Sequence, residues 1–237
     1  MLRMRIRDLQ MSATLLLFGL LLASADIASA QVVLTESFEL PNTANFQTFN
    51  SGQTLVGASA SWSITTSGID LFEDAARPEA AVFDGTQAID LAGSPGAGVL
   101  ETSFTTVLGA TYELVFHYAR NNLLGSSIGD AQVDVVGTTS RLQATVQHDP
   151  VVQAFNVFRT FTQTFTADST TTTLRFTSLE AGNAGVVLDG IQVERVSAVP
   201  LLSLEGRGVL IAILLSVGVL MGGAAVGLRR RSGRTLA

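Results

Sequence analysis

One aspartate in the second half of the chain lies at a position where the pattern predicts burial, which is unfavourable for a carboxylate. Asp189, in the segment VVLDGIQVERV, shares the alternation of Val187, Ile191 and Val193, which predicts an apolar row of a strand. A buried carboxylate needs backbone N–H donors, an Arg or a metal ion as compensation. Calcium binds carboxylates and carbonyls outside the cell. Two interpretations stay open: a structural Ca²⁺ with Glu39 as second ligand, since first and last strands often meet in jelly rolls, or a carboxylate satisfied by loop amides.

Two further residues are candidates for ligand binding. Trp62, the only tryptophan, lies in SASWSITTSGIDLF, and such a side chain either stacks on a sugar ring or anchors a core. Asp84 belongs to the loop-like, charged segment 72–85, FEDAARPEAAVFDG. This segment is either a rim that binds a ligand or cation, or a solvated loop.

The motifs typical of catalysis lack their required context. The segment GSSIG, residues 125–129, fits G-x-S-x-G, but that motif needs a helix after it, and here the strand-like AQVDVV follows. His117 and His148 are isolated in the sequence. A glycosidase needs two carboxylates across the sugar, and sequence alone cannot place such a pair. No catalytic residue is therefore predicted.

The elements that must position these residues are short strands. Segment 110–119, ATYELVFHYA, alternates with period two, and Gly, Asn and Asp turn signals separate it from similar runs. Thr and Val are abundant and no long helical period is present. The predicted strands cover residues 32–38, 61–66, 69–73, 87–91, 98–105, 110–119, 131–136, 141–146, 155–166, 171–178 and 186–196. This spacing predicts an all-β jelly-roll sandwich.

The composition excludes several function classes. Residues 31–198 carry 6 Arg and 17 Asp and Glu, a net charge of −11. So acidic a surface repels nucleic acid and suits cations or neutral ligands such as sugars. The chain contains no Cys and no Lys, which removes disulfides, Schiff-base chemistry and the phosphate-loop lysine.

A long apolar run near the C-terminus predicts a membrane helix. Residues 208–228 contain no charge over 21 residues, and at about 1.5 Å per residue they match a bilayer of roughly 30 Å. Arg229, Arg230 and Arg231 follow, a cluster that favours the cytoplasmic side. The tail 229–237 is therefore expected inside the cell.

The N-terminus has the pattern of a secretory signal. Three arginines precede a short apolar core, and Ala28 and Ala30 form a small-residue cleavage site before Gln31. We therefore expect a signal peptide over 1–30, an exported domain over 31–198 and a sorting linker over 199–207.

Five blocks of the domain resemble a known family. The segments ESFELP, SWSITTSGIDLF, VFDGTQAIDLAGSPGAGVLETSFTTVLGATYELVFHYARN, TFTADSTTTTLRFTS and AGVVLDGIQVERV occur in this order. They resemble the choice-of-anchor C family of exported bacterial proteins, similar to plant cell-wall proteins. The resemblance implies a galactose-binding-like β-sandwich over nearly all of residues 36–196.

The segment before the apolar run also resembles a family motif. Its residues are similar to the IPTL variant of the PEP-CTERM sorting signal: Val199, Pro200, Leu202, Ser203 and Gly206. The resemblance implies that an exosortase-type enzyme processes the chain near Pro200. The membrane helix would then be a temporary anchor.

These observations predict an exported, noncatalytic surface or matrix protein with a carbohydrate-binding-like jelly roll. Its expected partners are extracellular polysaccharide or wall glycan, the sorting enzyme and the membrane, with no nucleic acid. Two alternatives stay open: an extracellular glycan hydrolase, and a structural or adhesive matrix protein without a small ligand.

Overall fold

The described part of the chain forms one compact unit. The computed structural model describes residues 30–76, 80–124 and 127–196, which belong to a unit spanning Ser29–Ser197. Within these ranges, no helix has both the length and the apolar character needed to cross a bilayer. The expected signal peptide, sorting motif, membrane helix and basic tail lie outside the described residues, apart from Ala30.

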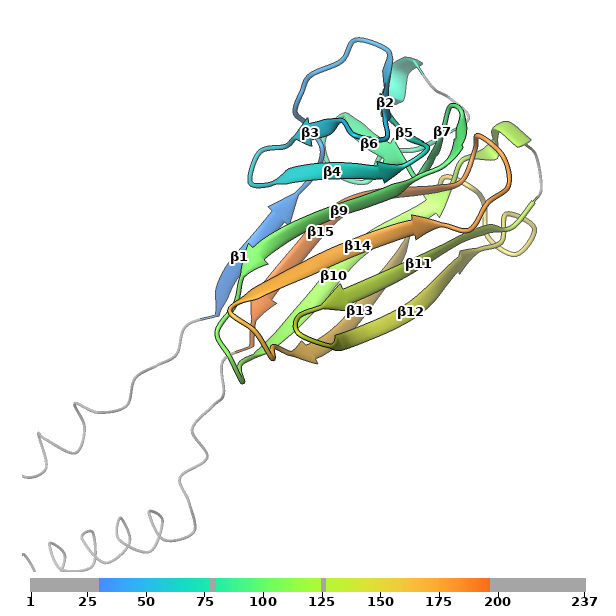
Figure 1. Cartoon of the computed structure of the whole chain (residues 1–237). Coiled ribbons are helices and arrows are strands. Elements are labelled where there is room, and N and C mark those ends of the chain that lie inside the picture. Colours follow the sequence, from blue (N-terminus) through green and yellow to red (C-terminus); the bar gives the residue numbers. More distant parts are fainter. Residues whose placement is uncertain (1–29, 77–79, 125–126, 197–237) are drawn as a thin grey trace, which may run out of the picture. The chain divides into compact units, whose positions relative to one another are not determined.

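Two antiparallel sheets make up the unit, as Figure 1 shows. The first, sheet A, has the strand order β13-β10-β15-β6-β5-β2, and β1 also pairs with β15. Its strands are β1 (Gln31–Glu36), β2 (Phe46–Asn50), β5 (Gly68–Glu73), β6 (Gln87–Asp90), β10 (Thr111–Arg120), β13 (Arg159–Thr166) and β15 (Val186–Arg195).

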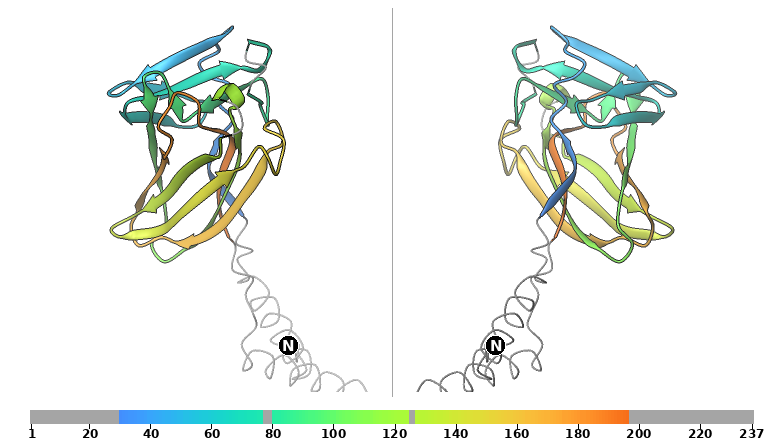
Figure 2. Two further views of the ribbon diagram at one scale, coloured as in Figure 1. Left: turned by 90° about the vertical axis from the view of Figure 1, so that its right-hand side faces the viewer. Right: turned by 90° about the vertical axis from the view of Figure 1, so that its left-hand side faces the viewer.

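The second sheet, sheet B, has six strands in the order β12-β11-β14-β9-β4-β3. Its strands are β3 (Thr54–Val56), β4 (Ser61–Thr66), β9 (Val99–Thr105), β11 (Gly129–Val136), β12 (Ser140–His148) and β14 (Thr171–Ser178). A short ribbon pairs β7 (Ala92–Gly93) with β8 (Gly96–Ala97), and single 3-10 turns stand at η1 (Asp74–Ala76) and η2 (Asn122–Leu124). Figure 2 shows the layers from two further sides.

The all-β sandwich predicted from the sequence is confirmed, and each predicted strand has a counterpart. The largest boundary error is in 155–166, where β13 begins only at Arg159. Strands β2 and β3 were missed because their sequence, FQTFNSGQTLV, is rich in polar and turn-forming residues. They pair with β5 and β4, so neighbouring strands rather than local pattern determine their conformation.

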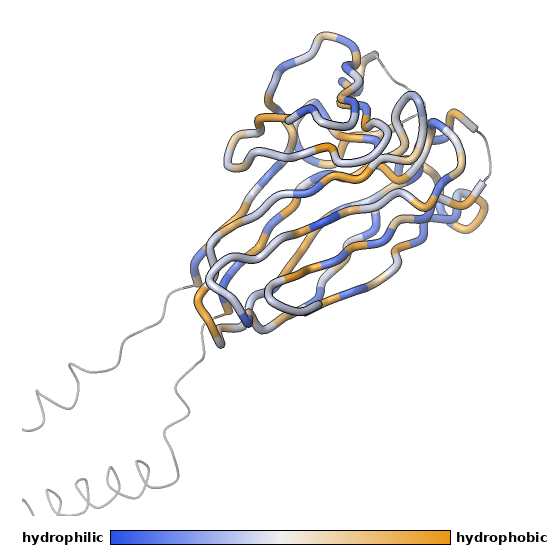
Figure 3. Tube along the Cα trace, in the orientation of Figure 1, coloured by the Kyte–Doolittle hydropathy of each residue, from blue (hydrophilic) through white to orange (hydrophobic). Residues whose placement is uncertain are grey.

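Alternating side chains of both sheets form the core. In Figure 3 hydrophobic and hydrophilic residues alternate along the strands, as period-two geometry requires. The largest fully buried side chain is Trp62, whose ring lies 5.7 Å from Phe38 and 6.4 Å from Phe176, between centroids. The long strands are thereby held as a rigid frame for the loops at their ends.

Candidate functional site

A β-bulge in β15 sets the direction of Asp189. Val115 of β10 faces Gln192, but His117 faces Asp189, so Gly190 and Ile191 together oppose one residue of β10. Gly190 has φ +55°, the left-handed conformation that glycine tolerates in such bulges. The expected apolar row is therefore interrupted: Ile191 belongs to the core between the sheets, whereas Asp189 lies on the outer face of sheet A.

Loop amides satisfy the buried Asp189 carboxylate. Its Oδ2 accepts hydrogen bonds from the N–H groups of Phe83 and Asp84, both at 2.8 Å, and its Oδ1 accepts from Gly190 N–H at 2.7 Å. The side chain is fully buried, and burial raises its pKa to about 7. Asp189 thus holds the loop before β6 against the outer face of sheet A.

Glu39 binds the same loop at a different place. Its Oε1 accepts from the N–H groups of Thr86 and Gln87, both at 2.9 Å, and its Oε2 accepts from the Thr86 hydroxyl at 3.0 Å. The two predicted calcium ligands therefore hold successive amides of one loop. Over residues 30–76, 80–124 and 127–196, no group of three or more His, Cys, Asp or Glu is arranged to hold a metal ion. The loop-amide interpretation accounts for the burial of Asp189 without a metal ion, and the calcium site stays a prediction.

Trp62 is not available to a ligand. It is fully buried, and its indole Nε1 lies 3.3 Å from Oε2 of Glu36, to which it donates. A ring without exposed surface cannot stack on a sugar, so the ligand-binding expectation for Trp62 is wrong and the core alternative holds.

Asp84 lies exposed beside a stacked aromatic pair. The neighbouring Phe83 ring stacks on the His117 imidazole with centroids 3.5 Å apart and planes 10° apart, and Phe158 lies 5.6 Å away. His117 thus covers one face of Phe83, and about half of the residue stays exposed (50 %). The loop fills this part of the outer face of sheet A, and the solvated-loop interpretation fits Asp84.

The structure brings together two aspartates that sequence reasoning did not single out. Asp70 of β5 and Asp90 of β6 are direct cross-strand partners. Each stands in the tripeptide Ile-Asp-Leu, at 69–71 and at 89–91, with Ile and Leu buried in the core. Both carboxylates therefore lie on the outer face of sheet A. An aspartate between two large apolar residues of a strand, occurring twice, was the signal that could have revealed them.

Asp90 is a structural carboxylate that binds the amides of two neighbouring loops. Its Oδ1 accepts from Ala92 N–H at 2.8 Å and Gly185 N–H at 3.0 Å, and its Oδ2 accepts from the Asn121 side-chain amide at 2.7 Å. Only 2 % of the residue is exposed, and burial raises its pKa to about 7. Asp90 thereby fixes the position of Asn121 and of the loop before β15.

A buried arginine supports the same loops. Arg120 donates from Nε to the Ser127 carbonyl at 3.0 Å and from Nη1 to the Ala184 carbonyl at 2.6 Å. Its Nη2 donates to the Ser127 hydroxyl at 2.6 Å and lies 3.9 Å from the Glu180 carboxylate. This charge is completely buried, so its bonds hold Ser127 and the 180–184 segment together.

A small pocket opens above Asp70 and Asp90. Its volume is about 120 Å³, and its lining consists of Phe46, Asp70, Phe72, Ala80, Asp90, Ser94, Asn121, Leu123 and Asn183. At about 30 Å³ per water it holds the equivalent of a few waters, which suits one sugar edge rather than a chain. We call it the aspartate pocket.

The chemistry of the aspartate pocket suits a neutral, hydroxyl-rich ligand. Asp70 Oδ1 accepts from the Thr48 hydroxyl at 2.6 Å, and among the described residues no side chain or amide donates to its other oxygen. Ligand hydroxyls can donate to that carboxylate and bond with the amides of Asn121 and Asn183, while Phe46, 43 % exposed, forms an apolar wall. The acidic side chains in the described lining are Asp70 and Asp90, and a carboxylate repels an anion.

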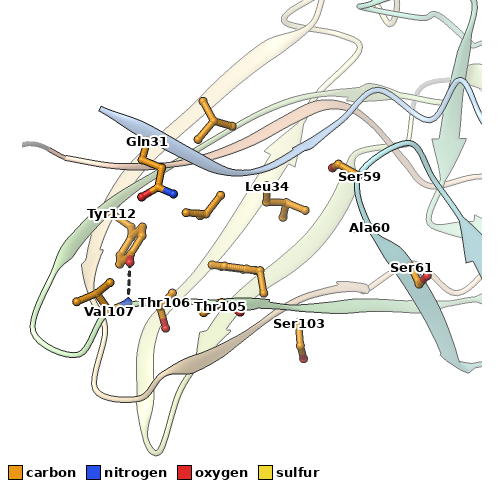
Figure 4. A pocket seen from close by; sticks show the side chains of 13 residues that line it. Gln31, Leu34, Ser59, Ala60, Ser61, Ser103, Thr105, Thr106, Val107 and Tyr112 are labelled. Atoms are coloured by element: carbon orange, nitrogen blue, oxygen red, sulfur yellow. Dashed lines mark hydrogen bonds between the residues drawn. The ribbon is translucent and has the colours of Figure 1, made fainter. Parts of the chain in front are cut away.

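A larger groove lies at the opposite end of the unit, between β1 and β9 (Figure 4). It has a volume of about 550 Å³ and uncharged lining side chains such as Leu34, Ser59 and Tyr112. The Tyr112 hydroxyl accepts from Val107 N–H at 2.8 Å. The groove is the unclosed side of the sandwich, and none of its described lining residues carries a charge that could orient a ligand.

Several predicted positions are not tested by the structure. Ala28, the sorting residues Val199, Pro200, Leu202, Ser203 and Gly206, and the basic cluster Arg229, Arg230 and Arg231 lie outside the described residues. Ala30 is the first described residue and is exposed.

Comparison with known proteins identifies no family. No family model matches the chain. Halomucin of Haloquadratum walsbyi (strain DSM 16790 / HBSQ001) is 28% identical over 174 residues, which cover 70% of this chain. The chain spans only 2% of the length of that relative.

Several solved structures are similar at low identity. The CBM22-1 xylan-binding domain of Xyn10C from Paenibacillus barcinonensis is 14% identical with a TM-score of 0.43, covering 72% of this chain and 97% of that one. A family 35 carbohydrate binding module from Clostridium thermocellum is 13% identical with a TM-score of 0.40, covering 72% and 100%. The K1 cleaved adhesin domain of Lys-gingipain from Porphyromonas gingivalis W83 is 16% identical with a TM-score of 0.43, covering 70% and 98%. At these scores the likenesses assign neither a family nor a ligand to this chain.

Proposed function

We propose that the sandwich is a noncatalytic carbohydrate-binding domain of an exported surface or matrix protein. The observation that carries this proposal is the aspartate pocket, where a carboxylate, two amides and an exposed aromatic ring converge on a space for one sugar edge. Such a mixture of acceptors, donors and apolar wall matches the hydroxyl and C–H groups of a sugar. The ligand is a neutral glycan, because the pocket offers negative charge and the domain is strongly acidic.

A glycan binding panel with two single substitutions tests the proposal. We expect residues 29–197, the compact unit, to bind one class of neutral polysaccharide saturably. Phe46→Ala and Asp70→Asn should each weaken binding about tenfold, because an anchor of this kind contributes more than about 1 kcal/mol. Phe83→Ala is the matched control, since Phe83 is similarly exposed (50 %) but lies outside the pocket. If the folded unit binds no glycan of the panel, the alternative of a structural matrix protein without a small ligand is favoured.

A glycan hydrolase is the second candidate, since one observation favours it. The pocket holds two facing carboxylates, and burial raises the pKa of Asp90 to about 7, as in a general acid. Against it, hydrogen bonds from Ala92, Gly185 and Asn121 occupy both oxygens of Asp90. Release of reducing sugar by the wild-type unit, lost in Asp90→Asn and Asp70→Asn, would establish the hydrolase and refute the noncatalytic proposal.

Export and C-terminal processing complete the proposal and rest on sequence alone. The signal-like residues 1–30, the apolar run 208–228 and the following arginines support an exported domain with a membrane anchor. The resemblance to choice-of-anchor C proteins and to the PEP-CTERM signal supports processing near Pro200 by an exosortase-type enzyme. The mature domain would then reside at the cell surface or in the matrix.

A further inference from the structure

Strand β13 is a long edge strand with regular pairing along its inner side. It ends sheet A, pairs only with β10, and keeps an unbroken register from Thr111↔Thr166 to Tyr118↔Arg159. Among the other edges, β3 has three residues, β2 has five and β1 contains a register shift, whereas β12, the nine-residue edge of sheet B, carries the charged Arg141. Residues 160–166 contain no charge and no proline, so this edge lacks the usual devices against strand pairing.

The sequence of this edge is a palindrome. Residues 160–166 read TFTQTFT, which is the same in both directions about Gln163. Two antiparallel copies of β13, related by a two-fold axis at Gln163, therefore place like residues opposite each other: Phe161 faces Phe165 of the second copy, and Thr162 faces Thr164. Aromatic pairs and threonine pairs are stabilising cross-strand combinations.

The backbone of β13 has the correct phase for this pairing. Ala167 N–H donates to the Ala110 carbonyl next to β10, so the odd-numbered residues direct their backbone groups toward β10. The even-numbered threonines then direct their N–H and C=O groups to the free edge. In the palindromic register Thr162 meets Thr164 of the second copy, and such a pair of outward residues exchanges two N–H···O bonds.

The side chains around the edge are compatible with a second copy. Phe161 and Phe165 already stack on Phe116 and Tyr112 in the core, at centroid distances of 4.7 Å and 5.4 Å, which holds β13 straight. The same register sets Arg159 opposite Ala167 of the second copy, one residue from Asp168, so opposite charges lie near each other at each end.

Arginines mark the ends of the exposed segment. Arg141 Nε donates to the Thr166 carbonyl at 2.7 Å, and Arg159 Nη1 donates to the Gln147 carbonyl at 3.1 Å. Between them, Thr162, Gln163 and Thr164 are exposed. The central threonine pairs of the palindrome are thus the part of the edge that is open.

From this edge we propose that the domain self-associates through β13, joining two copies of sheet A into one continuous antiparallel sheet with its two-fold axis at Gln163. The partner is a second copy of this chain. The interface is isologous, so it closes as a dimer. For a surface or matrix protein it supplies a homotypic link between chains that is separate from the aspartate pocket.

A single introduced cysteine tests the register, because the chain contains none. Opposed residues of a non-hydrogen-bonded pair have Cα atoms about 4.5 Å apart, within disulfide range. Gln163→Cys in the full chain, in mild detergent with a weak oxidant, should therefore cross-link into a dimer as its major product. Ser63→Cys, equally exposed on β4, is the control and should cross-link at least fivefold less.

Charge substitutions at the seam test the pairing independently. In the Gln163→Cys background, Thr162→Lys with Thr164→Lys sets like charges opposite each other and should reduce the cross-link at least fivefold. Thr162→Lys with Thr164→Glu sets Lys opposite Glu and should restore it. Fluorescence of the buried Trp62 reports that each variant is folded. A folded Gln163→Cys chain that cross-links no better than Ser63→Cys, or Lys/Lys and Lys/Glu variants that cross-link equally, would overturn the proposal.

Discussion

The outer faces of the two sheets are built in opposite ways. Loops cover the β5–β6–β15 part of sheet A, and two aspartates there, Asp90 and Asp189, accept hydrogen bonds mainly from backbone amides. On sheet B the comparable groups bond to side chains, Asp134 while buried (7 % exposed) and Glu101 near solvent. Asp134 accepts from Gln132 and Gln143, and Glu101 accepts from Arg175 at 2.8 Å.

This difference shows which buried carboxylates hold loops in one conformation. A carboxylate buried against backbone amides fixes a loop in one conformation, because the amides lose their only partner when it is removed. A carboxylate bonded to mobile side chains near the surface leaves those partners able to turn to water. The covered face of sheet A therefore supplies the rigid surroundings of the aspartate pocket, and sheet B supplies a solvated surface.

The largest expected effect comes from removing a loop-binding carboxylate. Asp189→Ala leaves the amides of Phe83, Asp84 and Gly190 without their acceptor and should lower the free energy of unfolding by about 3 kcal/mol. Thermal denaturation would show this as a Tm decrease of roughly 6–12 °C. Arg175→Ala on sheet B, the control, should cost about 0.5 kcal/mol or less. Equal losses at both sites would remove the contrast between the faces.

A second prediction concerns pH. Burial raises the pKa of Asp90 and of Asp189 to about 7 in the folded state, against about 3.9 in an unfolded chain. Between these values the folded state binds more protons, so stability decreases as pH rises from about 4 to about 7. Urea denaturation of the compact unit should therefore give a lower free energy of unfolding at pH 7.5 than at pH 5.

Two substitutions test whether Asp90 and Asp189 cause this pH dependence of the free energy of unfolding. Asp90→Asn and Asp189→Asn should each flatten the dependence between pH 5 and 7.5, whatever their effect on absolute stability. Asp168, at the end of β13, behaves oppositely: the Thr139 hydroxyl bonded to it lowers its pKa, so its contribution is lost only as pH falls below about 4. Asp168→Asn is thus the control that should leave the slope unchanged, and stability rising with pH in the wild type would contradict the prediction.

The smallest expected effect is that of chelation. Because Glu39 and Asp189 bond to successive amides of one loop, a chelator should leave the Tm of the compact unit unchanged within about 1 °C, an effect below about 0.5 kcal/mol. Scanning calorimetry with and without EDTA measures this. A clear decrease in Tm, reversed by Ca²⁺, would restore the calcium interpretation and make the covered face a metal-dependent one.

Local pattern was sufficient to predict most of the fold. Alternation in segments such as 110–119 identified the long strands, because a strand with one buried face must repeat with period two. It also marked Asp189 as buried, and it left Trp62 open between core and platform. It did not find β2 or β3, whose polar residues become strands only beside β5 and β4.

Contacts between distant segments were beyond prediction from the sequence. Asp70 and Asp90 form one site only because β5 and β6 pair in a register that sets them opposite each other. Likewise, the bulge at Gly190 turns Asp189 away from the row of Ile191, which a count of alternating residues cannot detect.

The alternation of residues, the sparse charge and the palindrome TFTQTFT can all be read from the chain alone. That this palindrome lies on a free edge, and that two Ile-Asp-Leu segments share a pocket, follows from how the strands pair in space. The physical reason is that alternation is a property of neighbouring residues in one strand. Register, edge position and loop contacts depend instead on hydrogen bonds and packing between strands that are far apart in the chain.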